Sequence, residues 1–337
     1  MARADKAVMR LALGLGLAVL LAYGLALALP FVVCVMAVLV LCMPGPPIPF
    51  LKGVIMAAAV AVLVAAGVLM VPLLEHYALA GVMLTGAMLY ALFRRGGGRI
   101  TPQATILVIT LTVIPVAGVA EQALAPLLAK SLALGIGTGV LVSGVSHALF
   151  PDPPQADGST QTPAATASPD PAGALRATLV ILPVFMLALT NPSTFLAALI
   201  KSVALAQQAG VATARNAGRE LVGSTLMGAW MAALAWFGLS LRPNLVMLML
   251  WAVLAALWAG ARIFGVKASA MSPSFWINAL VTMLILLGPA IEDSAVGKDV
   301  VVAGAIRLCV FVGLALYAWA TVWALERWRA ARAVAVS

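Results

Sequence analysis

Charged side chains are scarce in this sequence. Lysine, arginine, aspartate and glutamate make up only 9% of the 337 residues, whereas hydrophobic residues make up 64%. A soluble domain carries about a quarter charged residues, so this composition excludes an ordinary soluble protein and predicts an all-α polytopic membrane protein. The net charge of +9 does not indicate a nucleic-acid partner, because the cations lie in short loops between apolar runs. There they act as topology signals and contact membrane lipid.

Cysteine and histidine are also rare. The three cysteines, Cys34, Cys42 and Cys309, all lie in apolar runs without a CxxC pair, so no disulfide and no metal site is predicted. His76 and His147 are the two histidines, and contact with solvent or headgroups is the favoured interpretation of both. No Walker A, GxSxG or HExxH motif occurs, nor a pair of carboxylates inside an apolar run. The sequence therefore predicts neither an enzyme nor a cofactor.

The apolar runs predict about twelve transmembrane helices. The run from Leu11 to Met43 is too long for one span and is interrupted by Pro30, so we expect a hairpin of two short helices. The twelve expected spans are residues 11–28, 31–43, 53–71, 78–93, 103–119, 130–149, 176–190, 193–209, 219–240, 244–261, 274–291 and 303–325.

A polar segment divides the chain into halves. Residues 151–174 are rich in proline, alanine, serine and threonine and have no apolar period, which is typical of a disordered linker. The predicted organisation is a first six-helix repeat over residues 1–150, this cytoplasmic linker, and a second six-helix repeat with a short basic tail over residues 175–337.

The two halves share an order of landmarks, although identities are sparse. The corresponding features are Arg10 with Arg176, Pro30 with Pro192, Lys52-Gly53 with Arg219 to Gly223, Arg94-Arg95 with Arg262, Thr101-Pro102 with Ser272-Pro273, and Lys130 with Arg307. Six spans per half is an even number, so both repeats would have the same orientation. Such repeats are related by an axis along the membrane normal.

The distribution of cations supports this count. With the N-terminus in the cytoplasm, 15 of the 20 lysines and arginines fall on the cytoplasmic side and four on the outer side, with Lys201 set aside as intramembrane. If residues 11–43 formed a single span, the arginine-rich loop at 94–99 would face outward. The positive-inside bias therefore favours the hairpin and places both termini in the cytoplasm of a bacterial inner membrane.

The stretch from Lys130 to Phe150 carries a face of small residues. Ser131, Gly135, Gly139 and Ser143 recur every four residues, a spacing that lets helix backbones approach closely in a membrane. Gly135-Ile-Gly-Thr-Gly resembles a glycine loop, but it lies inside an apolar run, so helix packing is the favoured interpretation.

Three cations are candidate substrate-binding residues. Lys130 and Arg307 each open the last predicted helix of a repeat, and two such cations near a pseudo-twofold axis would form a positive mouth that attracts anions. Lipid snorkelling by each is the alternative. Lys201 lies inside an apolar span without an acidic neighbour in sequence, and an intramembrane lysine is a functional candidate by default. The alternative is that this helix is short and that Lys201 snorkels towards the inner membrane surface.

These features resemble the fusaric-acid-resistance (FUSC) superfamily of aromatic-acid exporters. The resemblance rests on two parallel six-span halves, a leading arginine, a proline-broken hairpin and a cationic last helix. Gln207-Gln208 followed by Gly218-Arg219-Glu220 and Gly223 is the most family-like segment. The chain departs from the family in one respect, because only the 151–174 linker stands where a large cytoplasmic domain separates the repeats. It therefore resembles a short branch of the superfamily.

The resemblance implies an inner-membrane exporter or permease for small organic anions, in particular aromatic carboxylic acids. It also implies a periplasmic adaptor of the HlyD type as partner. A passive organic-anion channel and a non-transporting membrane scaffold are the alternatives, and homo-oligomerisation stays open. The lack of intramembrane carboxylates is unusual for a proton-coupled exporter, since proton relays use Asp, Glu or His. Coupling through His147, or a channel, would remove this difficulty.

Overall fold

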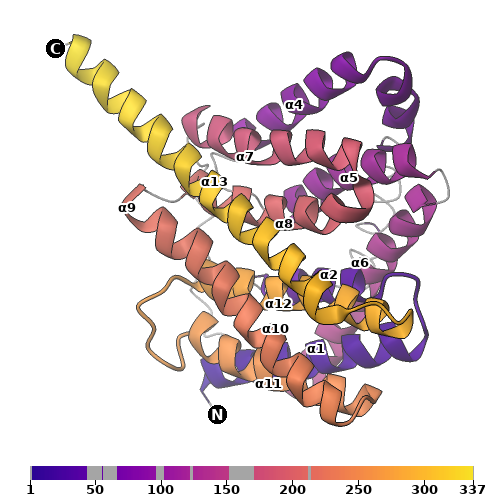
Figure 1. Cartoon of the computed structure of the whole chain (residues 1–337). Coiled ribbons are helices and arrows are strands. Elements are labelled where there is room, and N and C mark those ends of the chain that lie inside the picture. Colours follow the sequence, from indigo (N-terminus) through magenta and orange to yellow (C-terminus); the bar gives the residue numbers. More distant parts are fainter. Residues whose placement is uncertain are drawn as a thin grey trace. The chain divides into compact units, whose positions relative to one another are not determined.

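A computed structural model describes residues 2–43, 55, 67–95, 102–121, 124–151, 171–211 and 214–336. Every regular element in these ranges is a helix (Figure 1). In chain order they are α1 (Arg3–Gly24), α2 (Pro30–Leu41), the short helix Gly67–His76, α4 (Ala78–Arg95), α5 (Pro102–Ala120), α6 (Leu124–Leu149), α7 (Pro171–Thr190), α8 (Pro192–Val211), α9 (Ala214–Ala217), the π-helical turn η1 (Gly218–Val222), α10 (Gly223–Leu241), α11 (Leu245–Ile263), α12 (Pro273–Ala295) and α13 (Val300–Val336).

Seven of the described helices are long and apolar enough to cross a membrane, which is consistent with a multi-pass membrane protein. Four further apolar helices are shorter: Pro30–Leu41, Gly67–His76, Leu107–Ala120 and Phe195–Ala206. The predicted span 53–71 lies outside the described residues except for Ile55 and residues 67–71. The total of twelve spans therefore stays a prediction.

The predicted break in the first apolar run is confirmed. Helix α1 ends at Gly24 and α2 begins at Pro30, where the fixed φ of proline suits the first helical position and its missing N–H costs no helical hydrogen bond. Ala26 adopts a φ of 48° in the connection, a left-handed conformation that stops the helix. The hairpin is therefore made by the backbone at residues 25–29.

Several helices begin earlier than predicted, among them α1, which starts at Arg3 and not at residue 11. Helix α6 starts at Leu124, α7 at Pro171 and α13 at Val300. The predicted starts of α6 and α7 were placed at Lys130 and Arg176, but the residues before each are apolar or small and continue the helix. Residues 171–174 of the predicted linker consequently belong to the first turn of α7, while residues 152–170 lie outside the described part of the chain.

Polar caps fix the starts of three helices in the second half. The side chain of Asn244 accepts a hydrogen bond from Met247 N (2.8 Å), and that of Ser272 accepts one from Phe275 N (3.2 Å). Asp299 Oδ1 accepts from Val301 N (2.9 Å) and Val302 N at the start of α13. Each side chain satisfies an N–H that has no partner within its helix.

The helices gather into two compact units, each drawn from three separate segments of the chain. The first comprises Met1–Val62, Pro126–Ala164 and Leu226–Ala305, and the second comprises Leu63–Ala125, Ala165–Thr225 and Ile306–Ser337. Each unit thus combines helices from both halves of the sequence.

In the first unit, α1 packs against α2 and α11, α2 packs against α12, and α11 packs against α12 (Figure 1). Glycines on both sides allow α1 and α11 to approach closely. A Cβ on Gly16 would lie 2.7 Å from Val253 Cγ2, and one on Gly260 would lie 3.2 Å from Leu11 Cδ2. Such contacts are tighter than ordinary carbon–carbon contacts of about 3.5–4.0 Å, so this helix pair depends on glycine at both positions.

The small face of α6 packs against α2 within the same unit. A Cβ on Gly135 would lie 2.9 Å from Met36 Cβ, and one on Gly139 would lie 3.0 Å from Val40 Cβ. Ser131 and Ser143, the other members of this face, are buried. The packing interpretation of the glycine spacing is therefore supported, and α2 is the helix that this face contacts.

The second unit contains α4, α5, α7, α8 and most of α13. Helix α7 packs against α8 and α4, and α8 packs against α5. Helix α13 joins α7 through the Tyr317 hydroxyl, which donates to the Leu179 carbonyl oxygen at 2.9 Å. The family-like segment around Gly218 forms η1, where Gly218 lies against the Trp319 ring. A π-turn of this kind often marks a functional position in a helix.

Candidate functional site

Lys201 is completely buried near the centre of α8. It is the tenth of the 20 residues of this helix, and its exposed fraction is 0%. Helix α8 packs between α7 and α5 in the second unit. Desolvating an ammonium group is expensive, so the burial of Lys201 keeps it a candidate functional residue.

The local sequence explains how Lys201 comes to lie inside. Pro192 opens α8, and the apolar residues on both sides of the lysine are buried with it, including Leu199, Ile200 and Val203. The Ser202 hydroxyl donates to the Leu199 carbonyl oxygen at 2.6 Å, which satisfies the polar neighbour within its own helix. The burial of Lys201 agrees with its expected position inside an apolar span.

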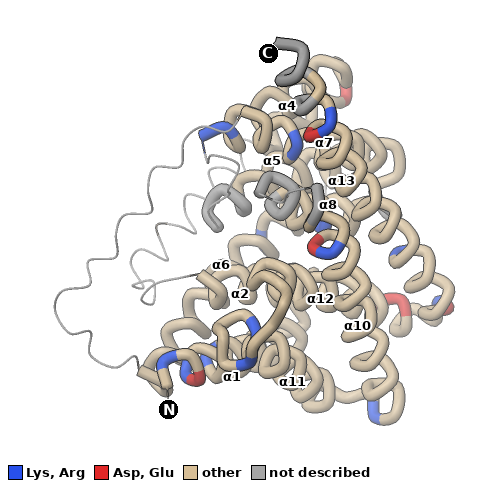
Figure 2. The backbone as a smooth tube through the Cα atoms, turned by 90° about the vertical axis from the view of Figure 1, so that its left-hand side faces the viewer, with Lys and Arg blue, Asp and Glu red and all other residues tan. Residues whose placement is uncertain are grey.

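Lys130 and Arg307 occupy similar positions in different helices. Lys130 is exposed and is the seventh residue of α6, whereas Arg307 is partly buried and is the eighth residue of α13. Both therefore lie about two turns inside their helices, not at the first residue as the sequence suggested. Lys130 belongs to the first unit and Arg307 to the second, so their common mouth stays a prediction. Figure 2 shows how sparse lysine and arginine are along the helices.

An ion pair between the buried Arg176 and the partly exposed Glu326 joins the first and last helices of the second half. Arg176 Nη1 of α7 lies 3.3 Å from Glu326 Oε1 of α13, and Arg176 is only 7% exposed. Arg10 of α1, its counterpart in the first half, is also 7% exposed. The sequence identified these arginines as landmarks of the two halves but did not indicate that either is buried, nor that Glu326 is the partner of Arg176.

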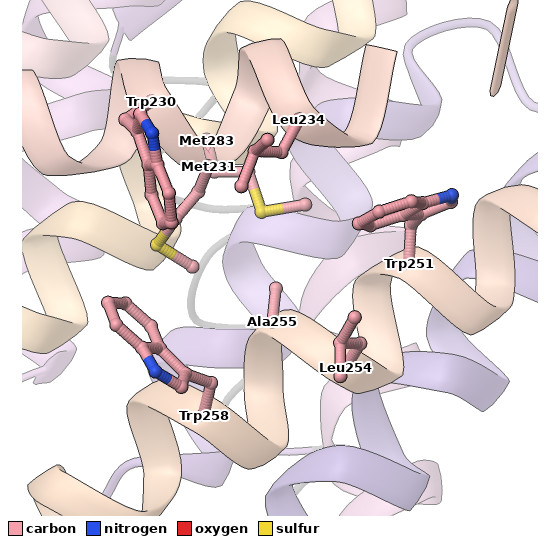
Figure 3. Close-up of a pocket in the computed structure, with 8 residues that line it drawn as sticks. All are labelled: Trp230, Met231, Leu234, Trp251, Leu254, Ala255, Trp258 and Met283. Atoms are coloured by element: carbon pink, nitrogen blue, oxygen red, sulfur yellow. The ribbon is translucent and has the colours of Figure 1, made fainter. Parts of the chain in front are cut away.

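A pocket lined by tryptophan and methionine lies in the first unit. It has a volume of about 190 Å³, and three helices contribute to it (Figure 3). Its lining residues are Trp230, Met231, Leu234, Trp251, Leu254, Ala255, Trp258 and Met283. This pocket was not predicted from the sequence. A signal was present in α11, where Trp251, Leu254, Ala255 and Trp258 follow the spacing of one helical face.

Arg262 lies beside this pocket in the last turn of α11. Its guanidinium carbon lies 4.1 Å from the Trp258 ring centroid and 4.7 Å from that of Trp276. Its Nη1 donates to the Trp258 carbonyl oxygen at 2.7 Å. Cation–π contacts with two rings hold the guanidinium in place.

The histidines and cysteines show no shared site. His147 Nδ1 lies 2.8 Å from the Ser143 carbonyl oxygen within α6, and His76 Nδ1 lies 3.0 Å from that of Pro72. All three cysteines are unpaired thiols. Among the described residues, no three His, Cys, Asp or Glu side chains are placed to hold a metal ion.

Comparison with known proteins gives one match. The model of a family described as "Protein of unknown function (DUF2955)" matches residues 7–145, a segment that contains α2, α4, α5 and most of α1 and α6. No curated protein and no solved structure matches the chain. The first part of this chain is thus similar to a family of unknown function, and the FUSC resemblance stays a prediction.

Proposed function

We propose that this chain is an inner-membrane exporter or permease for small organic anions, with aromatic carboxylic acids as the substrate class that the FUSC resemblance favours. The observation that carries the proposal is the complete burial of Lys201 at the centre of α8. A buried ammonium group attracts an anion and is stabilised by it in turn.

The distribution of carboxylates supports an anion as the substrate. Asp5 lies in the first turn of α1, and Glu292 and Asp293 lie in the last turn of α12. Glu326 lies within α13, where it pairs with Arg176. Lys201, in contrast, lies at a helix centre. A route that passes this lysine would select anions over cations.

The proposed architecture is a duplicated six-helix plan whose halves exchange helices. In the first unit the hairpin α1–α2 packs with α11 and α12, and in the second unit the hairpin α7–α8 packs with α4 and α5. The third, fourth and fifth helices of each half would thus complete the unit begun by the hairpin of the other half. The correspondence is supported by the burial of Arg10 in one half and of Arg176 in the other, and by the similar helix positions of Lys130 and Arg307.

We further propose that the chain spans the membrane twelve times, with both termini in the cytoplasm. Reporter fusions test this topology. Fusions after Arg99, within residues 151–174 and after Arg332 should report cytoplasm, whereas fusions at Glu75 and Asp293 should report periplasm. A periplasmic signal from the 151–174 segment would contradict the even number of spans in the first half.

Flux measurements in proteoliposomes test the role of Lys201. In Lys201→Met the charge is lost while the length and apolar character of the side chain are kept, so folding should persist. Efflux of benzoate, used as a probe anion, should fall at least about tenfold, which corresponds to about 1.4 kcal/mol in the barrier. Lys298→Gln is the matched control, because Lys298 is an exposed cation. Undiminished flux in Lys201→Met would remove Lys201 from the transport route.

A passive anion channel is the second candidate, because Asp5, Glu292 and Asp293 lie at helix ends and Glu326 is paired with Arg176. Proton-coupled carriers use intramembrane Asp, Glu or His as relays, and His147 lies in the last turn of α6. Counterflow separates the two candidates, because only a carrier accelerates uptake of labelled benzoate when unlabelled benzoate is loaded inside. The HlyD-type adaptor is proposed from the resemblance alone, and co-purification from envelopes would test it.

A further inference from the structure

The tryptophan pocket of the first unit is a groove lined mainly by α10 and α11. Trp230 and Leu234 line it from α10, Trp251 and Trp258 line it from α11, and the buried Met283 of α12 lies at its base (Figure 3). Its small lining residue, Ala255, leaves space between the two tryptophans of α11. Gly238 gives the Trp251 indole room to lie directly on α10.

The rim of this groove is exposed although it is apolar. Trp230 is 54% exposed, Leu254 55% and Leu234 39%. In a chain that spans a membrane, an apolar exposed surface of this kind contacts lipid chains. Any hydrocarbon chain beside α10 and α11 therefore has direct access to the groove.

Arg262 places a positive charge at one end of the groove. Arg262 is one helical turn beyond Trp258, and its guanidinium is held over the Trp258 and Trp276 rings. The Trp258 carbonyl engages one terminal nitrogen, and a guanidinium carries five N–H donors in total, whose fork geometry matches phosphate. Lys267 is exposed in the connection that follows α11.

The surrounding sequence favours an anionic occupant. Residues 221–291 contain no aspartate or glutamate, while they contain Arg242, Arg262 and Lys267. An anionic group beside Arg262 would therefore meet no carboxylate from α10, α11 or the greater part of α12. Trp258 and the buried Trp276 lie beside Arg262, and tryptophan together with basic residues is typical of the headgroup level of a membrane.

We propose that this groove binds one anionic phospholipid, with an acyl chain along the tryptophan and methionine side chains and the phosphate at Arg262. The dimensions fit, because Trp251 and Arg262 are 11 residues apart on α11, or about 16 Å along a helix. A fatty acyl chain spans such a length, whereas a small aromatic acid does not. This site is separate from Lys201 and does not depend on the proposed transport activity.

Native mass spectrometry of the detergent-purified full chain tests the proposal, with dioleoyl phosphatidylglycerol and dioleoyl phosphatidylcholine as probes. The wild type should bind the first phosphatidylglycerol more tightly than phosphatidylcholine. Arg262→Gln should weaken binding of phosphatidylglycerol about fivefold, the contribution of one basic residue near an anionic headgroup. Arg242→Gln, which removes a cation at the other end of α11, should leave the affinity unchanged.

A second pair of variants tests the apolar part of the groove. Ala255→Leu should fill the space between Trp251 and Trp258 and weaken binding of phosphatidylglycerol, whereas Ala233→Leu, at an exposed position of α10 outside the lining, should not. Thermal unfolding of each variant identifies any that fails to fold.

Three results would overturn the assignment. Equal affinity of the wild type for the two lipids would mean ordinary contact with bulk lipid. Unchanged phosphatidylglycerol binding in both Arg262→Gln and Ala255→Leu would place the bound lipid elsewhere. The third result combines two observations: neither lipid is preferred, and benzoate protects the wild type, but not Arg262→Gln, from thermal unfolding. The groove would then be a site for small anions.

Discussion

The contact between α6 and α2 provides the sharpest test of the fold, because α6 carries its own control. Gly139 faces α2, where an added Cβ would lie 3.0 Å from Val40 Cβ and 3.2 Å from Ala37 Cα. Gly137 lies two residues earlier on the same helix, and an added Cβ there would meet nothing within 4 Å. Leucine at the two positions therefore differs mainly in what it contacts.

The expected difference in stability between the two variants follows from these contacts. Replacing glycine in a helix removes a penalty of roughly 0.5–1 kcal/mol at either position. At Gly139 the new side chain also overpacks the contact with α2, which costs about 1–3 kcal/mol. Because the helix-propensity gain cancels in the comparison, Gly139→Leu should be less stable than Gly137→Leu by about 1–3 kcal/mol.

Thermal unfolding in detergent measures this difference. For a unit of this size, 1 kcal/mol corresponds to about 2–4 °C in Tm, so Gly139→Leu should unfold roughly 2–12 °C below Gly137→Leu. Fluorescence-detected size exclusion after heating gives both values from small samples. If Gly139→Leu unfolds at the same temperature as Gly137→Leu or above it, α6 does not pack against α2 through this face.

Three further predictions concern other contacts. Glu326→Gln should lower stability by about 1–3 kcal/mol because it removes the carboxylate from the buried Arg176, and a thermal shift of the detergent-purified variant measures this; an unchanged Tm would make the pair dispensable. Asp299→Ala should cost about 1 kcal/mol at the start of α13, also seen as a lower Tm, and an equal Tm would show that its cap contributes nothing. The double variant with Lys130→Gln and Arg307→Gln should reduce benzoate flux in proteoliposomes if these cations form a mouth, and wild-type flux would leave lipid snorkelling as their role.

Much of the fold class could be predicted because it depends on composition and on local backbone chemistry. The scarcity of charge predicted membrane helices, and Pro30 predicted the break between α1 and α2, which the structure confirms. The starts of α6 and α7 were predicted too late, because Lys130 and Arg176 were taken as helix boundaries. In an apolar run a single basic residue does not end a helix, since lysine and arginine are good helix formers.

The partners of each helix could not be predicted. In a membrane, helices associate through shape and small residues without a hydrophobic driving force, so the sequence of α1 does not reveal that α11 covers it. The pocket was missed for the same reason, because Trp230 and Trp258 meet only when α10 and α11 pack together. Lys201 could be singled out as a candidate from sequence, because a charged residue in the middle of an apolar span is unusual whichever helices it packs against.

The pairing of α1 with α11 has a consequence for biosynthesis. A Cβ on Gly24, the last residue of α1, would lie 3.5 Å from Leu245 Cδ2 at the start of α11, yet 221 residues separate the two positions (245 minus 24). At a synthesis rate of about 5–20 residues per second, α11 begins to be synthesised roughly 11–44 s after α1 is complete. During that interval the glycine-lined face of α1 is uncovered, and lipid or an assisting membrane protein must occupy it until the ribosome delivers the second half.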